Sequence, residues 1–409
     1  MNQESQKNAM AMAPTSSQEL AELVAELHKE NKPWHPCGMN TRMNWGPPIN
    51  GDSQAISSRG IHQIIHHAID DLTITVEAGL SLTELQKTLS EKGQWLAVDW
   101  PWGSSPILKP KSTGTIGGLI ARGLSGSLRQ KHLGVRDQLI GIGLIRSDGL
   151  EAHAGGQVVK NVAGYDLMRL LCGSWGSLAF ITQLTLRTEP IKSAHSYLTI
   201  NGKLQNIESF RSELLNSSFT PEYIDWKKET IKIWHLQLGL ASVTNKALED
   251  QIEGIQRLAN KHELKTQHQE WDGPPNLDNT SENLSTRKIN FLLRINMPPS
   301  MIIELINSEE LNSLSCWEWR FGAGTGLGEG WEVNSQTSNY LKSTNDISRL
   351  RNKITKLGGQ VVILIQPFNT INRISAWSNS PSAALIKAIK KQFDPKNQIA
   401  IGRLPGVSS

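Results

Sequence analysis

The spacing of apolar residues predicts both helix and strand in the first eighty residues. Between Gln18 and Asn31 apolar side chains recur at i, i+3, i+4 and i+7, which predicts an amphipathic helix that ends before Pro33. Residues 61–68 show similar spacing and predict a second short amphipathic helix. Residues 72–78 alternate between apolar and polar side chains, which predicts a half-buried strand.

The next helix carries its own start signal. Ser81 and Glu84 form a capping box, in which the Ser81 hydroxyl accepts from the backbone N–H of Glu84 and the Glu84 side chain reaches back. Leucines continue the pattern over 82–89, and Gly93 is typical of a helix end. A helix is therefore expected over these residues.

Two strands and a turn follow in a glycine-rich stretch. Residues 138–146 and 150–154 flank Ser147-Asp148-Gly149, which predicts a hairpin. Residues 177–188 predict a further strand, which Pro190 stops. We place a domain boundary near Pro190.

The second half contains less glycine and alternates strands with helices. Strands are expected at 231–240, 288–296 and 360–366, and helices at 245–262, 300–306, 346–357 and 382–393. This order predicts an α+β layer with the strands in one sheet, and no repeat of solenoid period is present.

Composition excludes several classes. The chain has 409 residues, of which 38% are hydrophobic and 20% charged, with a net charge of +4, so neither a disordered chain nor an electrostatic nucleic-acid binder is expected. Cys37, Cys172 and Cys316 lie far apart, which argues against a disulfide framework, a zinc ribbon or a cysteine-ligated iron–sulfur cluster. No apolar run is long enough to cross a bilayer, and residues 1–17 form a polar lead without a secretory signal. We expect a cytoplasmic protein that meets a membrane only through a partner or a surface.

Glycine is unevenly distributed, because 15 of the 34 glycines lie between positions 101 and 190. Thr115 can cap a short helix over 116–118, whose free N–H groups and glycines suit a phosphate. Close packing of a loop explains the same glycines equally well. A second candidate segment is 160–166, in which Lys160 can bind an anion or be a solvated charge. Asp166 can pair with the phenol of Tyr165 or act as a helix N-cap.

Two common nucleotide motifs are missing. No GxGxxG stands between a predicted strand and helix with an acid about 20 residues later, and no GxxxxGK[ST] is present. The glycines of 322–328 do not have the dinucleotide spacing, and a loop is the better interpretation there.

Several separated motifs together resemble the FAD-binding domain of the vanillyl-alcohol oxidase family, the PCMH-type fold. The resemblance is greatest to the FAD-binding subunits of bacterial glycolate oxidases (glycolate dehydrogenases). The motifs that carry it are CGMNTR (37–42), DLTITVEAG (71–79), TIGG (115–118), GVRD (134–137), KNVAGYD (160–166) and GSLAFIT (176–182). The resemblance covers about residues 34–190 well and the C-terminal half more loosely.

This resemblance implies an α+β fold with a defined order of domains. A disordered lead over 1–17 precedes a two-subdomain PCMH-type FAD-binding domain over 18–190, and an α+β cap domain follows over 191–409. It implies FAD as the cofactor, held non-covalently, because Asn40 stands where covalent members of the family carry histidine.

The resemblance also implies which residues contact FAD. It assigns the backbone of two segments to the pyrophosphate. It assigns two other segments to the ribityl chain and the isoalloxazine. The pyrophosphate group comprises Gly38, Met39, Asn40, Thr41, Thr115, Ile116, Gly117 and Gly118. The second group comprises Lys160, Val162, Gly164, Tyr165 and Ile181.

The sequence departs from the family pattern at three places. Met39 and Ala179 stand where glycine is usual, and the segment 394–402 lacks the Asn-Pro of the family's C-terminal motif. These departures question individual contacts and leave the fold expectation intact.

No catalytic residue or metal site is assigned. The HxGDGNxH-like segment that related 2-hydroxy-acid dehydrogenases associate with a metal is missing, and His62 and His66 are better read as one face of a surface helix. Arg136, Arg169 and Arg320 can contact a carboxylate, although a structural role is the commoner use of arginine. The 13 tryptophans suit a buried core or, as the less favoured alternative, a surface that docks a partner.

The resemblance implies a subunit of a glycolate oxidase complex, with a larger flavin subunit and an iron–sulfur subunit as partners. Such a complex oxidises glycolate, or a related 2-hydroxy acid such as D-lactate, to the 2-oxo acid. Two alternatives remain open at this point. One is a self-sufficient FAD-dependent 2-hydroxy-acid dehydrogenase, and the other is a non-catalytic scaffold that has lost FAD.

Overall fold

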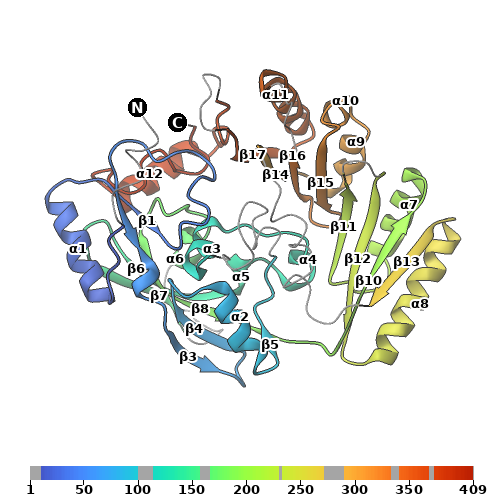
Figure 1. Ribbon diagram of the computed structural model, residues 1–409, viewed down its shortest axis with the longest axis horizontal. Coiled ribbons are helices and arrows are strands. Elements are labelled where there is room, and N and C mark those ends of the chain that lie inside the picture. The colour runs from blue at the N-terminus through green and yellow to red at the C-terminus, as the bar shows by residue number, and fades with distance from the viewer. Residues whose placement is uncertain are drawn as a thin grey trace.

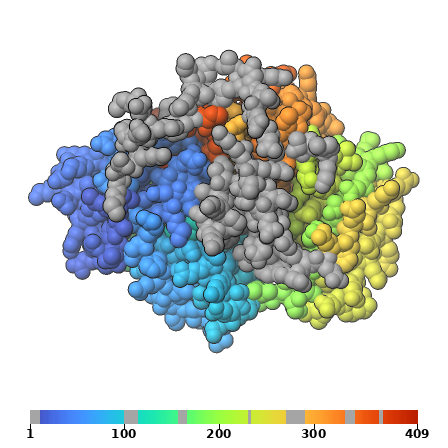
Figure 2. Space-filling model, viewed as in Figure 1, coloured from blue at the N-terminus to red at the C-terminus, as the bar shows by residue number. Residues whose placement is uncertain are grey.

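A computed structural model describes residues 11–99, 114–156, 166–229, 233–270, 290–332, 340–367 and 373–408. Within these residues the strands form a five-stranded sheet, an eight-stranded sheet and two short two-stranded ladders. In Figure 1 the five-stranded sheet lies on the left, and the eight-stranded sheet forms the right and upper part. Figure 2 shows the same division as a blue to cyan surface beside a green to orange one. The predicted α+β class is confirmed.

The five-stranded sheet is antiparallel, with strand order β3-β4-β8-β6-β7. Its strands are β3 (Ile64–Ala68), β4 (Thr73–Glu77), β6 (Leu139–Ile145), β7 (Glu151–Gly155) and β8 (Phe180–Arg187). The helices whose buried side chains join its core are α2 (Leu82–Ser90), α3 (Ile116–Arg122), α5 (Val135–Gln138) and α6 (Leu167–Leu171). Burial of leucine and isoleucine from both layers is what holds α3 against the sheet.

A smaller layer covers one side of this unit. Helix α1 (Ser17–Lys29) begins at Ser16, whose side chain accepts from the backbone N–H of Glu19, and it buries an apolar stripe. Strands β1 (Trp34–Cys37) and β2 (Gln54–Ser57) pair in parallel. The remaining short elements up to Pro190 are the 3-10 turn η1 (Ser58–Gly60) and, outside this layer, helix α4 (Arg129–His132) and the ladder of β5 (Gln94–Trp95) with β9 (Glu189–Pro190).

The eight-stranded sheet has the order β13-β10-β12-β11-β15-β16-β14-β17, and all its neighbours are antiparallel. Its strands are β10 (Ala194–Asn201), β11 (Tyr223–Lys228), β12 (His235–Ser242), β13 (Lys265–Glu270), β14 (Leu292–Asn296), β15 (Trp317–Gly322), β16 (Leu327–Glu332) and β17 (Gln360–Ile365). The helical elements of this unit are α7 (Leu204–Leu215), α8 (Asn245–Lys261), η2 (Pro299–Met301), α9 (Ile302–Ile306), α10 (Glu309–Asn312) and α11 (Tyr340–Lys356).

The two faces of this larger sheet differ. Helices lie along one face, as Figure 1 shows for α7 and α8 at the right, and one large apolar core joins them to the strands. On the other face Lys227, Arg320 and Glu329 occupy paired positions on adjacent strands. We call the five-stranded sheet with the elements that pack on it the first unit. Asp225 from the same face of the larger sheet accepts a hydrogen bond from Ser127 of the first unit, so the polar face meets that unit.

The chain returns to the first unit at its C-terminal end. After β17, helix α12 (Ala383–Phe393) buries Lys390, whose Nζ donates to the carbonyl of Ser177 at 2.7 Å and pairs with Asp394 at 2.6 Å. Ile399 forms a parallel bridge with Trp34. The domain boundary near Pro190 stays a prediction. Helix α12 and the residues around Ile399 pack on the five-stranded unit, whereas Ile374 and Ala376 contact the core and strand β17 of the larger unit.

Most of the long elements agree with the sequence. The helices at α1, α2, α8, α11 and α12, the strand β4 and the hairpin of β6 and β7 are confirmed. The expected helix over 61–68 is wrong, because β3 pairs there with β4 through His67 and Ile74. Ile64 and Ile65 are β-branched and favour a pleated strand over a helix. Asp166 precedes α6 but makes no capping bond, and its carboxylate pairs with Arg169 at 2.8 Å.

The predicted aromatic burial is confirmed for the tryptophans that the structure describes near the two clusters. Those with at most 8% of their surface exposed are Trp95, Trp317, Trp319 and Trp331. Trp100 and Trp102 lie outside the described residues. The core interpretation is therefore the correct one for these four rings.

Candidate functional site

A pocket opens between the turn after β1, helix α3 and the start of β8. The space between its walls is about 780 Å³ when the open solvent at its mouth is included. The turn and α3 contribute Gly38, Met39, Asn40, Thr41, Thr115, Gly117 and Gly118, and β8 contributes Ile181. The structure thus brings together eight of the residues that the sequence assigned to a cofactor, from three segments far apart in the chain.

The turn that follows β1 is built to face an anion. Asn40 has a φ of +56°, a left-handed conformation that asparagine tolerates better than most residues. Such a turn directs consecutive N–H groups into a concave nest, which binds anions. Over the described residues no acceptor is recorded for the N–H groups of Met39, Asn40 and Thr41. Three main-chain donors therefore remain available to a ligand in the pocket.

Gly38 connects this turn to α3. A Cβ at this position would stand 2.4 Å from Oγ1 of Thr115, which is a clash. Thr115 caps α3, because its Oγ1 accepts from the N–H of Gly118 at 3.2 Å. The glycine thus lets the turn lie directly on the helix cap.

The first amides of α3 are engaged within the fold. The N–H of Ile116 donates to the carbonyl of Leu80 at 2.9 Å, and that of Gly117 donates to Ala78 at 2.8 Å. Ile116 is fully buried in the core and does not line the pocket. The expectation that these amides bind a phosphate is therefore revised, because both already have acceptors. A Cβ on Gly117 would lie 2.8 Å from the Cβ of Ala78, so close packing requires this glycine.

Three arginines line the pocket and were not singled out from the sequence. They are Arg42 from the turn, Arg122 from the end of α3 and Arg403 from the C-terminal segment. Burial lowers the pKa of Arg42 and that of Arg403 to about 10. Burial lowers the pKa of Arg122 well below its usual value, and the charges of Arg42 and Arg403 add to the effect. No lining residue of the described chain carries a carboxylate side chain, so the pocket is electropositive.

The arginines that the sequence did single out lie elsewhere. Arg136 is exposed, and Arg169 pairs with Asp166. Nε of Arg320 donates to the buried Asp225 at 2.6 Å, which holds the polar face of the larger sheet. The structural interpretation of Arg169 and Arg320 agrees with these partners.

Four predicted residues cannot be placed. Lys160, Val162, Gly164 and Tyr165 lie outside the residues that the structure describes. Their assignment to FAD stays a prediction.

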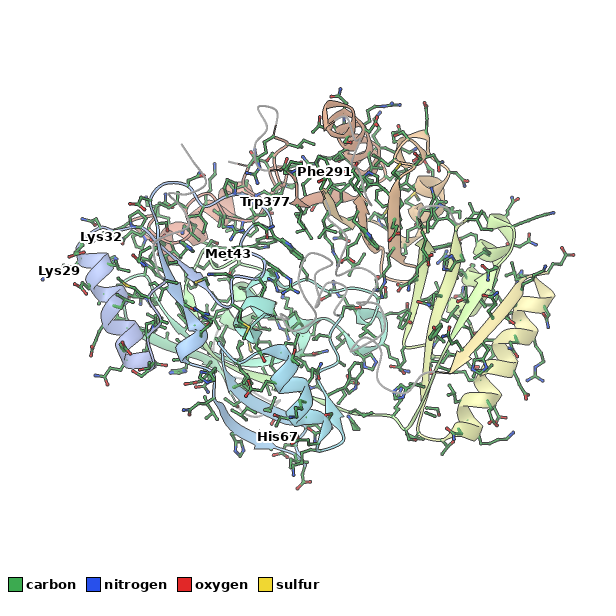
Figure 3. All side chains as sticks on the ribbon, viewed as in Figure 1. Lys29, Lys32, Met43, His67, Phe291 and Trp377 are labelled. Atoms are coloured by element: carbon green, nitrogen blue, oxygen red, sulfur yellow. The ribbon has the colours of Figure 1, made fainter. Side chains whose placement is uncertain are left out.

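The histidines of β3 are distant from the pocket. Figure 3 labels His67 at the outer edge of the smaller sheet and the pocket residue Met43 near the centre of the molecule. In the part of the chain that the structure describes, no group of three or more histidine, cysteine, aspartate or glutamate side chains is arranged to hold a metal ion. No described helix is long and apolar enough to cross a membrane.

Two nucleophilic side chains near the turn are in environments that keep them neutral. Cys37 lines the pocket, and burial raises the pKa of its thiol to about 11. His35 lies next to it in β1 but does not line the pocket, and its Nδ1 is 2.9 Å from the Ser53 hydroxyl. Burial, together with the charge of Arg403, lowers the pKa of His35 to about 4.

Comparison with known proteins finds similarity over part of the chain. Residues 9–155 match the family described as FAD binding domain. The chain is 33% identical over 174 residues to glycolate oxidase subunit GlcE of Escherichia coli (strain K12), which covers 42% of this chain and 47% of that protein. It is 29% identical over 182 residues to glycolate oxidase subunit GlcD of Bacillus subtilis (strain 168), covering 44% and 36%. The D-lactate dehydrogenase [cytochrome] of Arabidopsis thaliana is 27% identical over 187 residues, covering 46% and 31%.

The chain therefore spans less than half the length of these curated relatives. Solved structures extend the likeness in fold. An alkyldihydroxyacetonephosphate synthase superposes with a TM-score of 0.69 over 95% of this chain and 75% of that one, and a chitooligosaccharide oxidase with 0.66 over 97% and 94%. Both are 13% identical, so they show the shared fold alone.

Proposed function

We propose that this chain, whose residues 9–155 match an FAD-binding domain, holds FAD non-covalently in the pocket and serves in the oxidation of a 2-hydroxy acid. The observation that carries the proposal is the convergence of the turn, the α3 cap and β8 on one electropositive cavity. Glycolate and D-lactate are the substrates we propose, since proteins named for them are among the relatives.

Different residues of the pocket would bind different parts of FAD. The N–H groups of Met39, Asn40 and Thr41 would donate to the diphosphate, and Gly118 would let it approach the helix because it carries no Cβ. The arginines supply positive charge, and Ile181 and Ala179 supply apolar wall. When bound, the flavin supplies the redox chemistry by accepting a hydride equivalent from the carbon that bears the hydroxyl.

Non-covalent binding is supported by the side chains near the turn. Asn40 has no nucleophilic nitrogen to form a flavin bond, and the Cys37 thiol is held protonated by burial. Acid precipitation of the purified protein should therefore release all of its flavin into the supernatant. Flavin that stays with the precipitate would contradict this part of the proposal.

We further propose that the chain works as one subunit of a complex. Glycolate oxidase relatives are named as subunits, and this chain has three cysteines with no CxxC pair to ligate an iron–sulfur cluster. A larger flavin subunit and an iron–sulfur subunit are the partners we propose, with any peripheral membrane contact made through them.

Purified protein tests these statements in order. Visible flavin absorbance with one FAD per chain would support the cofactor, and its complete absence after reconstitution would favour a scaffold. Glycolate and D-lactate are then added without oxygen. Bleaching of the flavin only after partner subunits are supplied supports the complex, whereas bleaching in the isolated chain indicates a self-sufficient dehydrogenase.

A further inference from the structure

Arg122 occupies a distinct electrostatic position within the pocket. Its guanidinium carbon lies 5.5 Å from the centre of the Trp45 ring, and that of Arg42 lies 5.4 Å from the same ring. Arg403 lies 5.8 Å from the centre of the Trp175 ring. Three cations thus line one cavity, positioned by aromatic rings that stabilise positive charge.

The three arginines differ in what they bind. Arg403 donates to the main-chain carbonyls of Met43, Trp45 and Pro47, so its role is to hold the turn. Arg42 donates to the Thr41 hydroxyl at 3.2 Å. For the guanidinium of Arg122, no hydrogen bond or ion pair with any described residue is recorded. Arg122 is thus a partly buried cation that lines the cavity and has no anionic partner among the described residues.

Burying like charges together is costly unless an anion joins them. The pKa of Arg122 is lowered by this burial and by its two charged neighbours, which is the sign of uncompensated positive charge. The FAD diphosphate carries about two negative charges, and the main-chain nest already serves it. Because the nest serves the diphosphate, the guanidinium of Arg122 is available to a second anion in the pocket.

Arg122 and the main-chain nest of residues 39–41 lie at opposite ends of α3. The nest meets α3 at its N-terminal end, where Gly38 approaches Thr115. Arg122 is the last residue of the same helix, about 7.5 Å farther along its axis from Gly117. Arg42 is close to both, because its Nη1 approaches Gly114 and its guanidinium shares the Trp45 ring with Arg122.

We propose that Arg122, supported by Arg42, forms an oxyanion site in the pocket that binds the carboxylate of the substrate. This inference rests on the proposed function, since the carboxylate is that of the 2-hydroxy acid. The planar guanidinium offers two parallel donors, which match the two oxygens of a carboxylate. Arg122 is thus a substrate-binding residue, distinct from the main-chain donors of the coenzyme.

The test measures binding of oxalate, an unreactive two-carbon carboxylate, to the FAD-loaded protein by calorimetry. Arg122→Gln should weaken oxalate binding about 10- to 100-fold and leave the FAD dissociation constant within about threefold of wild type. Arg122→Lys should keep part of the affinity, because the charge remains but the paired donors are lost. Arg129→Gln is the matched control, since Arg129 is exposed on α4 and does not line the pocket.

The outcomes are separable from those of the proposed function. Equal oxalate affinity in wild type and Arg122→Gln, or no oxalate binding by wild type, overturns the inference while a bound flavin still supports the coenzyme proposal. A large loss of FAD affinity with oxalate binding unchanged also overturns it, because the guanidinium would then serve the diphosphate. If wild type holds no FAD, the proposed function fails, and the same calorimetry on the free protein still decides the role of Arg122.

Discussion

At position 40 the main chain takes a left-handed conformation that most side chains resist, and the pocket depends on it. Asparagine and glycine adopt this conformation, whereas a β-branched residue does so only with strain. The side chain at this position is therefore less important than the φ angle of +56° that it permits. That distinction can be measured with two substitutions at one site.

We predict that Asn40→Gly retains FAD affinity within about threefold and that Asn40→Val loses at least tenfold. Valine strains the left-handed turn by about 1–2 kcal/mol and turns the donors of the nest away from a common point. FAD titration by fluorescence quenching gives both constants, and urea unfolding shows whether the rest of the fold is intact. Equal and large losses in both variants would mean that the asparagine side chain itself binds the coenzyme.

At the scale of elements, two adjacent glycines of α3 have different roles: Gly117 packs against Ala78, and Gly118 lines the pocket. Gly117→Ala should destabilise the protein by about 1–3 kcal/mol, because the new Cβ would lie 2.8 Å from the Cβ of Ala78. Gly118→Ala is the matched substitution, since its Cβ meets only Oγ1 of Thr115, at 3.2 Å. We expect it to fold with near wild-type stability but to bind FAD more weakly, because this Cβ faces the pocket.

Thermal unfolding and FAD titration on both variants give the comparison. A Gly117→Ala protein as stable as wild type would show that α3 can shift away from β4. Gly118→Ala with unchanged FAD affinity would show that the coenzyme does not approach the main chain there. Each result concerns one glycine, so either prediction can be contradicted without affecting the other.

Elements with local signals could be predicted from the sequence. The cap at Ser81 and the apolar stripe of α8 are contained within a few residues, and both appear as expected. The strand β11 was not predicted, because Asp225 and Lys227 are polar and therefore suggest a solvent-exposed segment. In the structure their face of the strand packs against the first unit. Polar burial of this kind depends on partners far away in the chain, which a period-2 pattern does not reveal.

At the scale of the whole molecule, the family resemblance located the turn and the α3 cap, and tertiary structure supplied the rest. Arg403 reaches the turn by a return of the C-terminal chain across about 360 residues, as its bond to the Met43 carbonyl shows. No local motif marks Arg403 or Arg122 as pocket residues. The positive charge of the site therefore could not be predicted from spacing.

The two units are also joined by a charge network centred on two buried side chains, His132 and Glu222. His132 of α4 lies with Nδ1 at 2.6 Å from Glu189 and Nε2 at 2.5 Å from Glu222, which precedes β11. Lys131 and Lys192 also donate to Glu222. Burial alone would lower the pKa of His132, but its bonds to the two carboxylates outweigh burial and raise it to about 9. Burial opposes the change for Glu222 as well, yet its three cationic partners lower its pKa to about 2.

These shifts predict how stability depends on pH. The pKa of His132 is higher in the folded protein than its ordinary 6.5, so its contribution is complete below pH 6.5 and is lost as the pH rises through about 9. The pKa of Glu222 is lower than its ordinary 4.5, so its contribution is complete above pH 4.5 and is lost toward about pH 2. The network should therefore stabilise the protein most between about pH 4.5 and 6.5.

The variant His132→Gln isolates the contribution of the histidine. The difference in unfolding free energy between wild type and this variant removes the pH dependence that other groups, such as Lys227, give to both proteins. Burial lowers the pKa of Lys227 to about 8, so it titrates in the same range. We expect the difference to shrink by about 2–3 kcal/mol between pH 6.5 and 9. The exposed His66→Gln should give no such trend. A difference that stays constant over this range would mean that His132 is neutral in the folded protein and that the junction is held by the two lysines instead.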